Sequence, residues 1–132
     1  MSYEVIQPPT SEQSLAKLGE EVLLAAKELG RPMDVEGFLQ AWLSGLRVIA
    51  ERNAENKITG LALLAVGRRW LFQDVAATVV WKKAKDDAAL LNYIKMLASA
   101  LGAVNLYVET DKPLEETDSF TRYEIVQHVL RK

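Results

Sequence analysis

The sequence contains no cysteine and a single histidine, His128, among its 132 residues. The absence of cysteine excludes disulfide bonds, thiolate metal sites and a cysteine nucleophile. One histidine cannot form a histidine metal cluster, and a catalytic triad would have to use His128. No apolar run reaches the roughly 20 residues that a membrane-spanning helix needs. The N-terminal stretch MSYEVIQPPT has no basic region followed by an apolar core, so we do not expect a secretory signal peptide.

The overall charge is also small. The formal net charge is −2, with 49% apolar and 26% charged residues. These values are typical of a soluble globular protein and do not indicate a nucleic-acid or membrane-surface binder. A chain of this length can bury a substantial core, so we expect a single domain over residues 1–132.

The N-terminal part of the chain predicts one strand followed by two helices. Residues 3–7 predict a short strand that ends before two prolines. A capping-box pattern at Thr10 and Gln13 precedes apolar residues at helical spacing, and Gly30 follows them. A second helix is predicted to begin at Asp34. The apolar residues of the first helix are Leu15, Leu18, Val22, Ala25 and Leu29.

The rest of the chain predicts mainly strands. Gly67-Arg68-Arg69 predicts a bend or turn, and residues 86–101 predict a helix with leucine or isoleucine at helical spacing. A helix between two strands makes a crossover, so the strands on either side should run parallel. The fold class is therefore α/β (mixed α+β), with a mostly antiparallel sheet flanked by helices in the order β-α-α-β-β-β-α-β-β. The predicted strands are 46–52, 58–66, 75–82, 104–109 and 120–130.

Three stretches carry a resemblance to a known family. They are ITGLALLAVGRRWLFQD, VAATVVWKKAKDDAALLNYIKMLASALGA and VNLYVET. In element order and length, residues 3–110 resemble the GNAT superfamily of N-acetyltransferases, in a form with a truncated C-terminal part. In texture the chain is most similar to divergent acetyltransferase-like proteins encoded by bacteriophages, some of which are virion components. The resemblance implies a groove for acetyl-CoA beside the strand that precedes the 86–101 helix.

The pyrophosphate loop of that family, [Q/R]-x-x-G-x-[G/A], corresponds here to residues 82–87. Lys82 matches the first position, but Lys85 and Asp87 stand where the family has small residues. A carboxylate at the phosphate position could cost on the order of a few kcal/mol by repulsion. The alternative interpretation is that Asp86 or Asp87 caps the helix while the lysines face solvent. If acetyl-CoA binding is retained, the resemblance assigns it to Val79, Val80, Trp81, Lys82, Lys83, Ala84, Lys85, Asp86, Asp87 and Ala88.

The candidates for proton transfer are few. The family often places a general-acid tyrosine near a late helix, but neither Tyr107 nor Tyr123 stands at that position. Carboxylates at strand ends could act as a general base, and Glu51, Asp74 and Glu109 are the candidates. For an active enzyme, the resemblance implies that residues 31–34, between the first two helices, help to form the amine site.

Two functions follow from these features. The first is a non-catalytic acetyltransferase-fold protein, a binding or structural subunit without a cofactor, in a phage particle or a phage–host complex. Its partners would be other protein subunits or a second copy, bound at a sheet edge or an apolar patch. The alternative is a divergent acetyl-CoA-dependent N-acetyltransferase acting on an amine of a protein or small molecule. Either protein is expected in the bacterial cytoplasm or in a virion, with no membrane partner.

Overall fold

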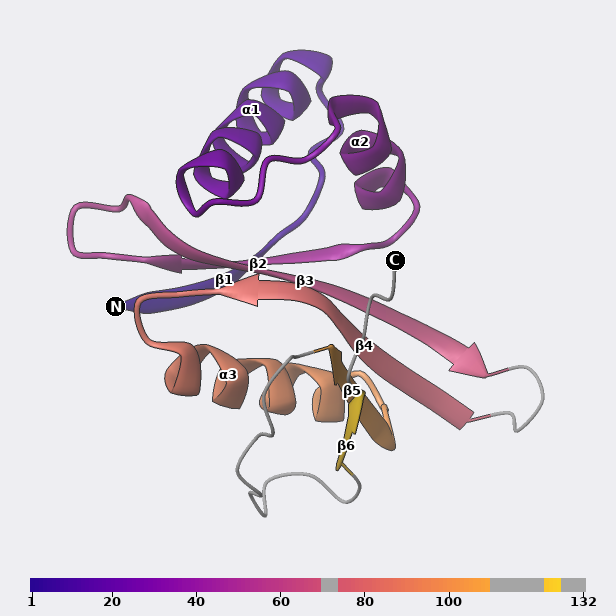
Figure 1. Ribbon diagram of the computed structural model, residues 1–132. Coiled ribbons are helices and arrows are strands. Elements are labelled where there is room, and N and C mark those ends of the chain that lie inside the picture. The colour runs from indigo at the N-terminus through magenta and orange to yellow at the C-terminus, as the bar shows by residue number, and fades with distance from the viewer. Residues whose placement is uncertain (70–73, 110–122, 127–132) are drawn as a thin grey trace, which may run out of the picture.

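The computed structural model describes residues 1–69, 74–109 and 123–126 of the chain. The strands form one six-stranded sheet in the order β1-β2-β3-β4-β5-β6 (Figure 1). Strands β1 to β4 pair antiparallel, whereas β5 runs parallel to β4 and to β6. The element order and the parallel crossover through α3 confirm the predicted mixed sheet. The elements are β1 (Ser2–Ile6), α1 (Glu12–Glu28), α2 (Val35–Leu43), β2 (Arg47–Arg52), β3 (Ile58–Arg69), β4 (Asp74–Lys83), α3 (Asp87–Ala100), β5 (Asn105–Glu109) and β6 (Tyr123–Val126).

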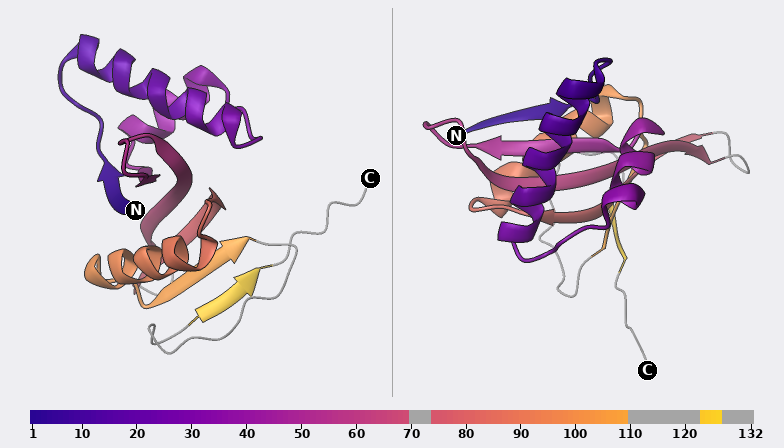
Figure 2. Two further views of the ribbon diagram at one scale, coloured as in Figure 1. Left: turned by 90° about the vertical axis from the view of Figure 1, so that its left-hand side faces the viewer. Right: turned by 90° about the horizontal axis from the view of Figure 1, so that it is seen from above.

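Helices cover both faces of the sheet. Figures 1 and 2 show α1 and α2 on one face and α3 on the other. The central strands are therefore buried on both sides, and successive residues of β2 enter different cores. Val48 packs in the core under α1 and α2, while Ile49 packs in the core under α3. The apolar run of β3 is buried on both faces at its centre, because Leu61 and Leu63 pack under α1 and α2 while Ala62 and Leu64 pack under α3.

Helix α1 follows the predicted periodicity, but its cap differs by one residue. Val22 and Ala25 are buried, and the leucines at the same spacing pack against the same core. Ser11, not Thr10, is the N-cap, and its hydroxyl accepts a hydrogen bond from the Ser14 amide at 3.4 Å. Ser and Thr have similar capping chemistry, so the sequence pattern alone does not distinguish neighbouring positions. Gly30 ends the helix with a φ of +94°, a conformation that favours glycine.

Two predicted boundaries were wrong or lie outside the described residues. Gly67-Arg68-Arg69 does not form a bend, because these residues pair with Ala76, Val75 and Asp74 and extend β3. The predicted strand over 120–130 is described only at Tyr123–Val126, and His128 and the remainder of that range lie outside the described residues. Within the described ranges, no helix is long and apolar enough to cross a membrane.

Candidate functional site

The central feature of the site is the point at which β4 stops pairing with β5. The two strands pair from Ala76 opposite Asn105 to Val79 opposite Val108, and β4 then continues alone to Lys83. On its other edge β4 stays paired with β3 as far as Lys83. Within the described residues, one backbone edge of residues 80–83 therefore has no strand beside it. Unpaired N–H and C=O groups on such an edge are available to a ligand.

A β-bulge lies at the point where the pairing of β4 with β5 ends. The pairing of β3 with β4 steps from Leu64 opposite Val79 to Leu63 opposite Trp81, so Val80 is the extra residue. Val79 is buried under α3, Val80 is 45% exposed, and Trp81 packs against the core under α1 and α2. Of the three residues predicted to line the acetyl-CoA groove, Val80 therefore exposes its side chain most, and Val79 and Trp81 could contribute mainly backbone groups.

The loop between β4 and α3 is closed by its own carboxylates. Asp86 is the N-cap of α3 and accepts a hydrogen bond from the Ala89 amide at 3.1 Å, which confirms the predicted helix cap. Asp87 Oδ1 accepts a hydrogen bond from the Ala84 amide at 3.1 Å and lies 3.9 Å from Lys82 Nζ. The Ala84 amide, which could meet a phosphate, is therefore already bonded to the Asp87 carboxylate.

The lysines of this loop lie on different faces of the sheet. Lys82 pairs with Ala62 on the face under α3, and its side chain is only 15% exposed. Lys83 lies on the opposite face, where its Nζ would be 3.8 Å from a Cβ placed on Gly30. The connection between α1 and α2, which the resemblance assigned to the amine site, thus comes close to the end of β4. Asp34 in that connection caps α2 by accepting a hydrogen bond from the Gly37 amide at 2.8 Å.

Glu51, the first candidate base, is fully buried. It accepts hydrogen bonds from the Tyr3 hydroxyl at 3.0 Å and the Thr59 hydroxyl at 2.8 Å, which ties β1, β2 and β3 together. Tyr3 also stacks on Tyr93 of α3, with ring centroids 5.5 Å apart. This position suits a structural role, and that of a base stays a prediction. The other two candidates, Asp74 and Glu109, begin β4 and end β5, and their side chains lie outside the described residues.

The environment of Tyr3 gives stability a dependence on alkaline pH. Burial, the hydrogen bond to Glu51 and the charges of Glu51 and Asp86 raise the pKa of Tyr3 from 10.0 to about 12. The unfolded chain then loses this proton at lower pH than the folded chain, so the stabilising contribution disappears as pH rises from about 10 to about 12. We expect the stability difference between wild type and Tyr3→Phe in urea unfolding to be constant below pH 10 and to shrink above it. A difference that stays constant to pH 12 would contradict this assignment.

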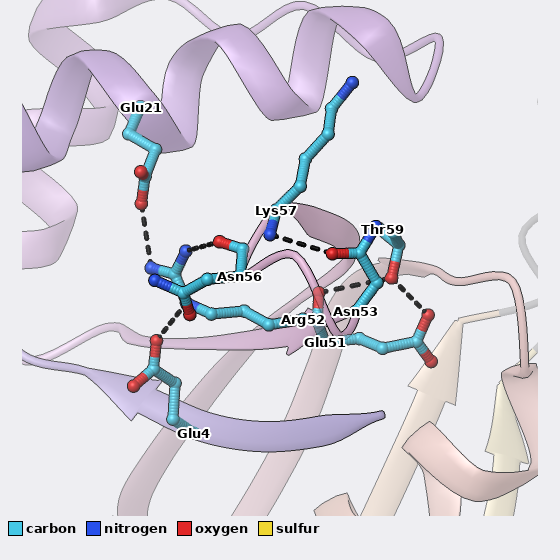
Figure 3. A network of polar contacts seen from close by, with 8 residues as sticks. All are labelled: Glu4, Glu21, Glu51, Arg52, Asn53, Asn56, Lys57 and Thr59. Atoms are coloured by element: carbon cyan, nitrogen blue, oxygen red, sulfur yellow. Dashed lines mark hydrogen bonds and ion pairs between the residues drawn. The ribbon is translucent and has the colours of Figure 1, made fainter.

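A polar network on the other face was not foreseen from the sequence (Figure 3). Arg52 donates to the carboxylates of Glu4 on β1 and Glu21 on α1, the latter at 2.8 Å, and to the carbonyl oxygen of Asn56 at 2.9 Å. Burial on its own would lower the pKa of Arg52, but the two carboxylates outweigh it and the net direction is upward. The network holds α1 against the sheet. No group of three potential metal-ligating side chains occurs among the residues described.

Comparison with solved structures identifies the fold. The chain is similar to a GNAT family acetyltransferase from Staphylococcus aureus (14% identity, TM-score 0.58), covering 92% of this chain and 98% of that one. It is also similar to a soil metagenomic aminoglycoside acetyltransferase in complex with sisomicin (18% identity, TM-score 0.60, 84% and 78% covered). A third is the Arabidopsis thaliana protein NAA60 in complex with acetyl-CoA (11% identity, TM-score 0.54, 81% and 73% covered). No protein-family model and no curated protein sequence matches the chain.

These similarities show that the chain has the fold of the GNAT acetyltransferases. The expected fold class is therefore confirmed. Fold alone does not decide activity, which depends on the open edge of β4 and the loop that follows it.

Proposed function

We propose that this chain is an acetyl-CoA-dependent N-acetyltransferase that acts on an amine of a protein or a small molecule. The observation that carries the proposal is that β4 stops pairing with β5 after Val79, beside a bulge at Val80, and continues to Lys83 with that edge open within the described residues. Similar folds include one in complex with acetyl-CoA and one in complex with sisomicin, which supports a thioester donor and an amine acceptor.

The open edge of β4 offers what acyl transfer requires. The backbone edge of residues 80–83 supplies N–H groups that can donate to a carbonyl oxygen, where negative charge develops as the amine attacks. The neutral amine nitrogen forms the new C–N bond and loses a proton to water, the C–S bond breaks, and the thiolate takes a proton from water. Holding the two reactants in line contributes much of the rate enhancement, so no dedicated acid residue is necessary.

A bulky side chain placed at the open edge of β4 tests this proposal. Val80→Trp puts a large side chain where β4 stops pairing with β5. We expect it to weaken acetyl-CoA binding at least about tenfold in calorimetric titration, because the indole ring would occupy the space that the donor needs. Val104→Trp is the matched control, because Val104 is also 45% exposed but lies just before β5, at the opposite end of that strand. The control should bind within about twofold of wild type. Absence of wild-type binding at about 1 mM acetyl-CoA, or equal binding by both variants, would reject the proposal.

The closed loop favours a second candidate, a binding or structural subunit built on the same fold. Asp87 already holds the Ala84 amide, so a donor phosphate would have to displace its carboxylate. Such a subunit would bind no thioester donor and would associate through a sheet edge such as β1. Sedimentation velocity over a range of concentrations separates the two candidates. A monomer that binds a thioester donor supports the enzyme, and a stable oligomer that binds none supports the subunit.

A further inference from the structure

We propose that Asp87 is a built-in competitor for the phosphate of the donor. Its carboxylate occupies the groups that a phosphate on this loop would contact, so the donor can bind only when Asp87 moves away. This inference rests on the proposed acetyltransferase function. It concerns how strongly the chain selects against donors that carry phosphate.

The geometry of one oxygen atom carries the inference. Asp87 Oδ1 accepts the Ala84 amide hydrogen bond at 3.1 Å and also faces Lys82 Nζ at 3.9 Å. A backbone amide together with an ammonium group is a usual pair of contacts for a phosphate oxygen. The Asp87 carboxylate therefore already makes the two contacts that an external anion would need.

The two partners of this contact differ in their freedom to move. The Lys82 side chain is 15% exposed and lies against the sheet, whereas the Asp87 side chain is 61% exposed. A mostly buried ammonium favours having an anion beside it, and an exposed aspartate can rotate into solvent without breaking core packing. A phosphate can thus replace Asp87 without movement of the backbone.

Asp86 differs from Asp87 although the two residues are adjacent. Asp86 accepts from the Ala89 amide, which is the bond of a helix cap, and its carboxylate makes no described contact with Lys82. Substituting either aspartate with asparagine removes one negative charge from the same loop. Only the substitution of Asp87 removes the charge that competes for Lys82 and the Ala84 amide.

The experiment compares two thioester donors on three proteins. Acetyl-CoA carries phosphates and acetyl-pantetheine carries none, and both are titrated into wild type, Asp87→Asn and Asp86→Asn by calorimetry. We expect Asp87→Asn to bind acetyl-CoA about tenfold more tightly, because a repelling charge at short range is removed. Acetyl-pantetheine affinity should change less than about twofold, and Asp86→Asn should change acetyl-CoA affinity less than about threefold. Asparagine keeps an acceptor for the Ala84 amide, and thermal unfolding confirms that the variants fold.

The outcomes separate this inference from the function beneath it. If all three proteins bind both donors and Asp87→Asn gains nothing for acetyl-CoA, the inference is wrong and the proposed function stands. An equal gain from both asparagine variants would show a general charge effect and would also overturn it. If no protein binds either donor, the proposed function and the inference fail together.

Discussion

Replacing Gly60 with alanine is expected to lower the free energy of unfolding by about 2 kcal/mol, because the added methyl group overpacks a closed contact. A Cβ on Gly60 would lie 2.6 Å from the Ala84 Cβ and 2.9 Å from the Ala84 Cα. It would also be 3.1 Å from the Glu51 Cβ. The nearest atoms belong to backbone or are fixed to it, so no side-chain rotation can relieve the clash, and the loop itself must shift.

The structure provides a control in the same strand. Among the described residues, no atom lies within 4 Å of the position of a Cβ on Gly67 of β3, so Gly67→Ala should change stability by less than about 0.5 kcal/mol. Urea unfolding of both variants measures the difference, and donor titration detects the shift of the loop as a second loss in Gly60→Ala alone. Equal stabilities of the two variants would show that β3 and Ala84 do not pack as closely as described.

Patterns of residue spacing predicted those parts of the fold in which burial is local and periodic. The leucines of α1 recur every three or four residues because one side of that helix meets the sheet. The apolar run of β3 indicated two buried faces, and Leu61–Leu64 are buried. The parallel pairing of β4 with β5 followed from the helix between them, because a crossover brings the chain back in the same direction.

The features that define the site depend on pairing register, which no spacing in one segment records. The bulge at Val80 is defined by its pairing with β3, and the open edge of β4 begins where the pairing with β5 ends. The sequence placed Gly60 within a predicted strand and did not indicate a special role. In the structure, its lack of a side chain lets Ala84, which is distant in sequence, pack close to β3. The sequence did predict that Asp86 or Asp87 caps α3. The contact of Asp87 with Lys82 required the direction of each side chain.

The weak donor binding expected here and the fold of an active family are compatible. The proposed acetyl transfer needs the backbone edge of residues 80–83, which has no neighbouring strand within the described residues. Under the same proposal, the loop at Asp87 would meet only the phosphate-bearing end of the donor. If the proposal holds, the absence of the loop glycines changes which donor is preferred and how tightly it is held, and it leaves the open edge of β4 unchanged.

Arg52→Met is expected to lower the free energy of unfolding by about 2 kcal/mol, because hydrogen bonds to charged groups at a mostly buried site are lost together. The Arg52 side chain is 11% exposed and joins β1, α1 and the turn after β2 through Glu4, Glu21 and Asn56. The two carboxylates are about half exposed and can regain water, which keeps the loss below the sum of three separate bonds.

Lys57→Met provides the comparison for Arg52, because Lys57 also pairs with a glutamate of α1. Its Nζ lies 3.9 Å from Glu28, and both side chains are more than half exposed. An exposed pair at this distance contributes little, so Lys57→Met should change stability by less than about 0.5 kcal/mol in the same urea titration. A loss from Lys57→Met as large as that from Arg52→Met would mean that general attraction between charges, and not the shared guanidinium, holds α1 on the sheet. Raising the salt concentration should then weaken wild type by the same amount, whereas the buried Arg52 network predicts a smaller effect of salt.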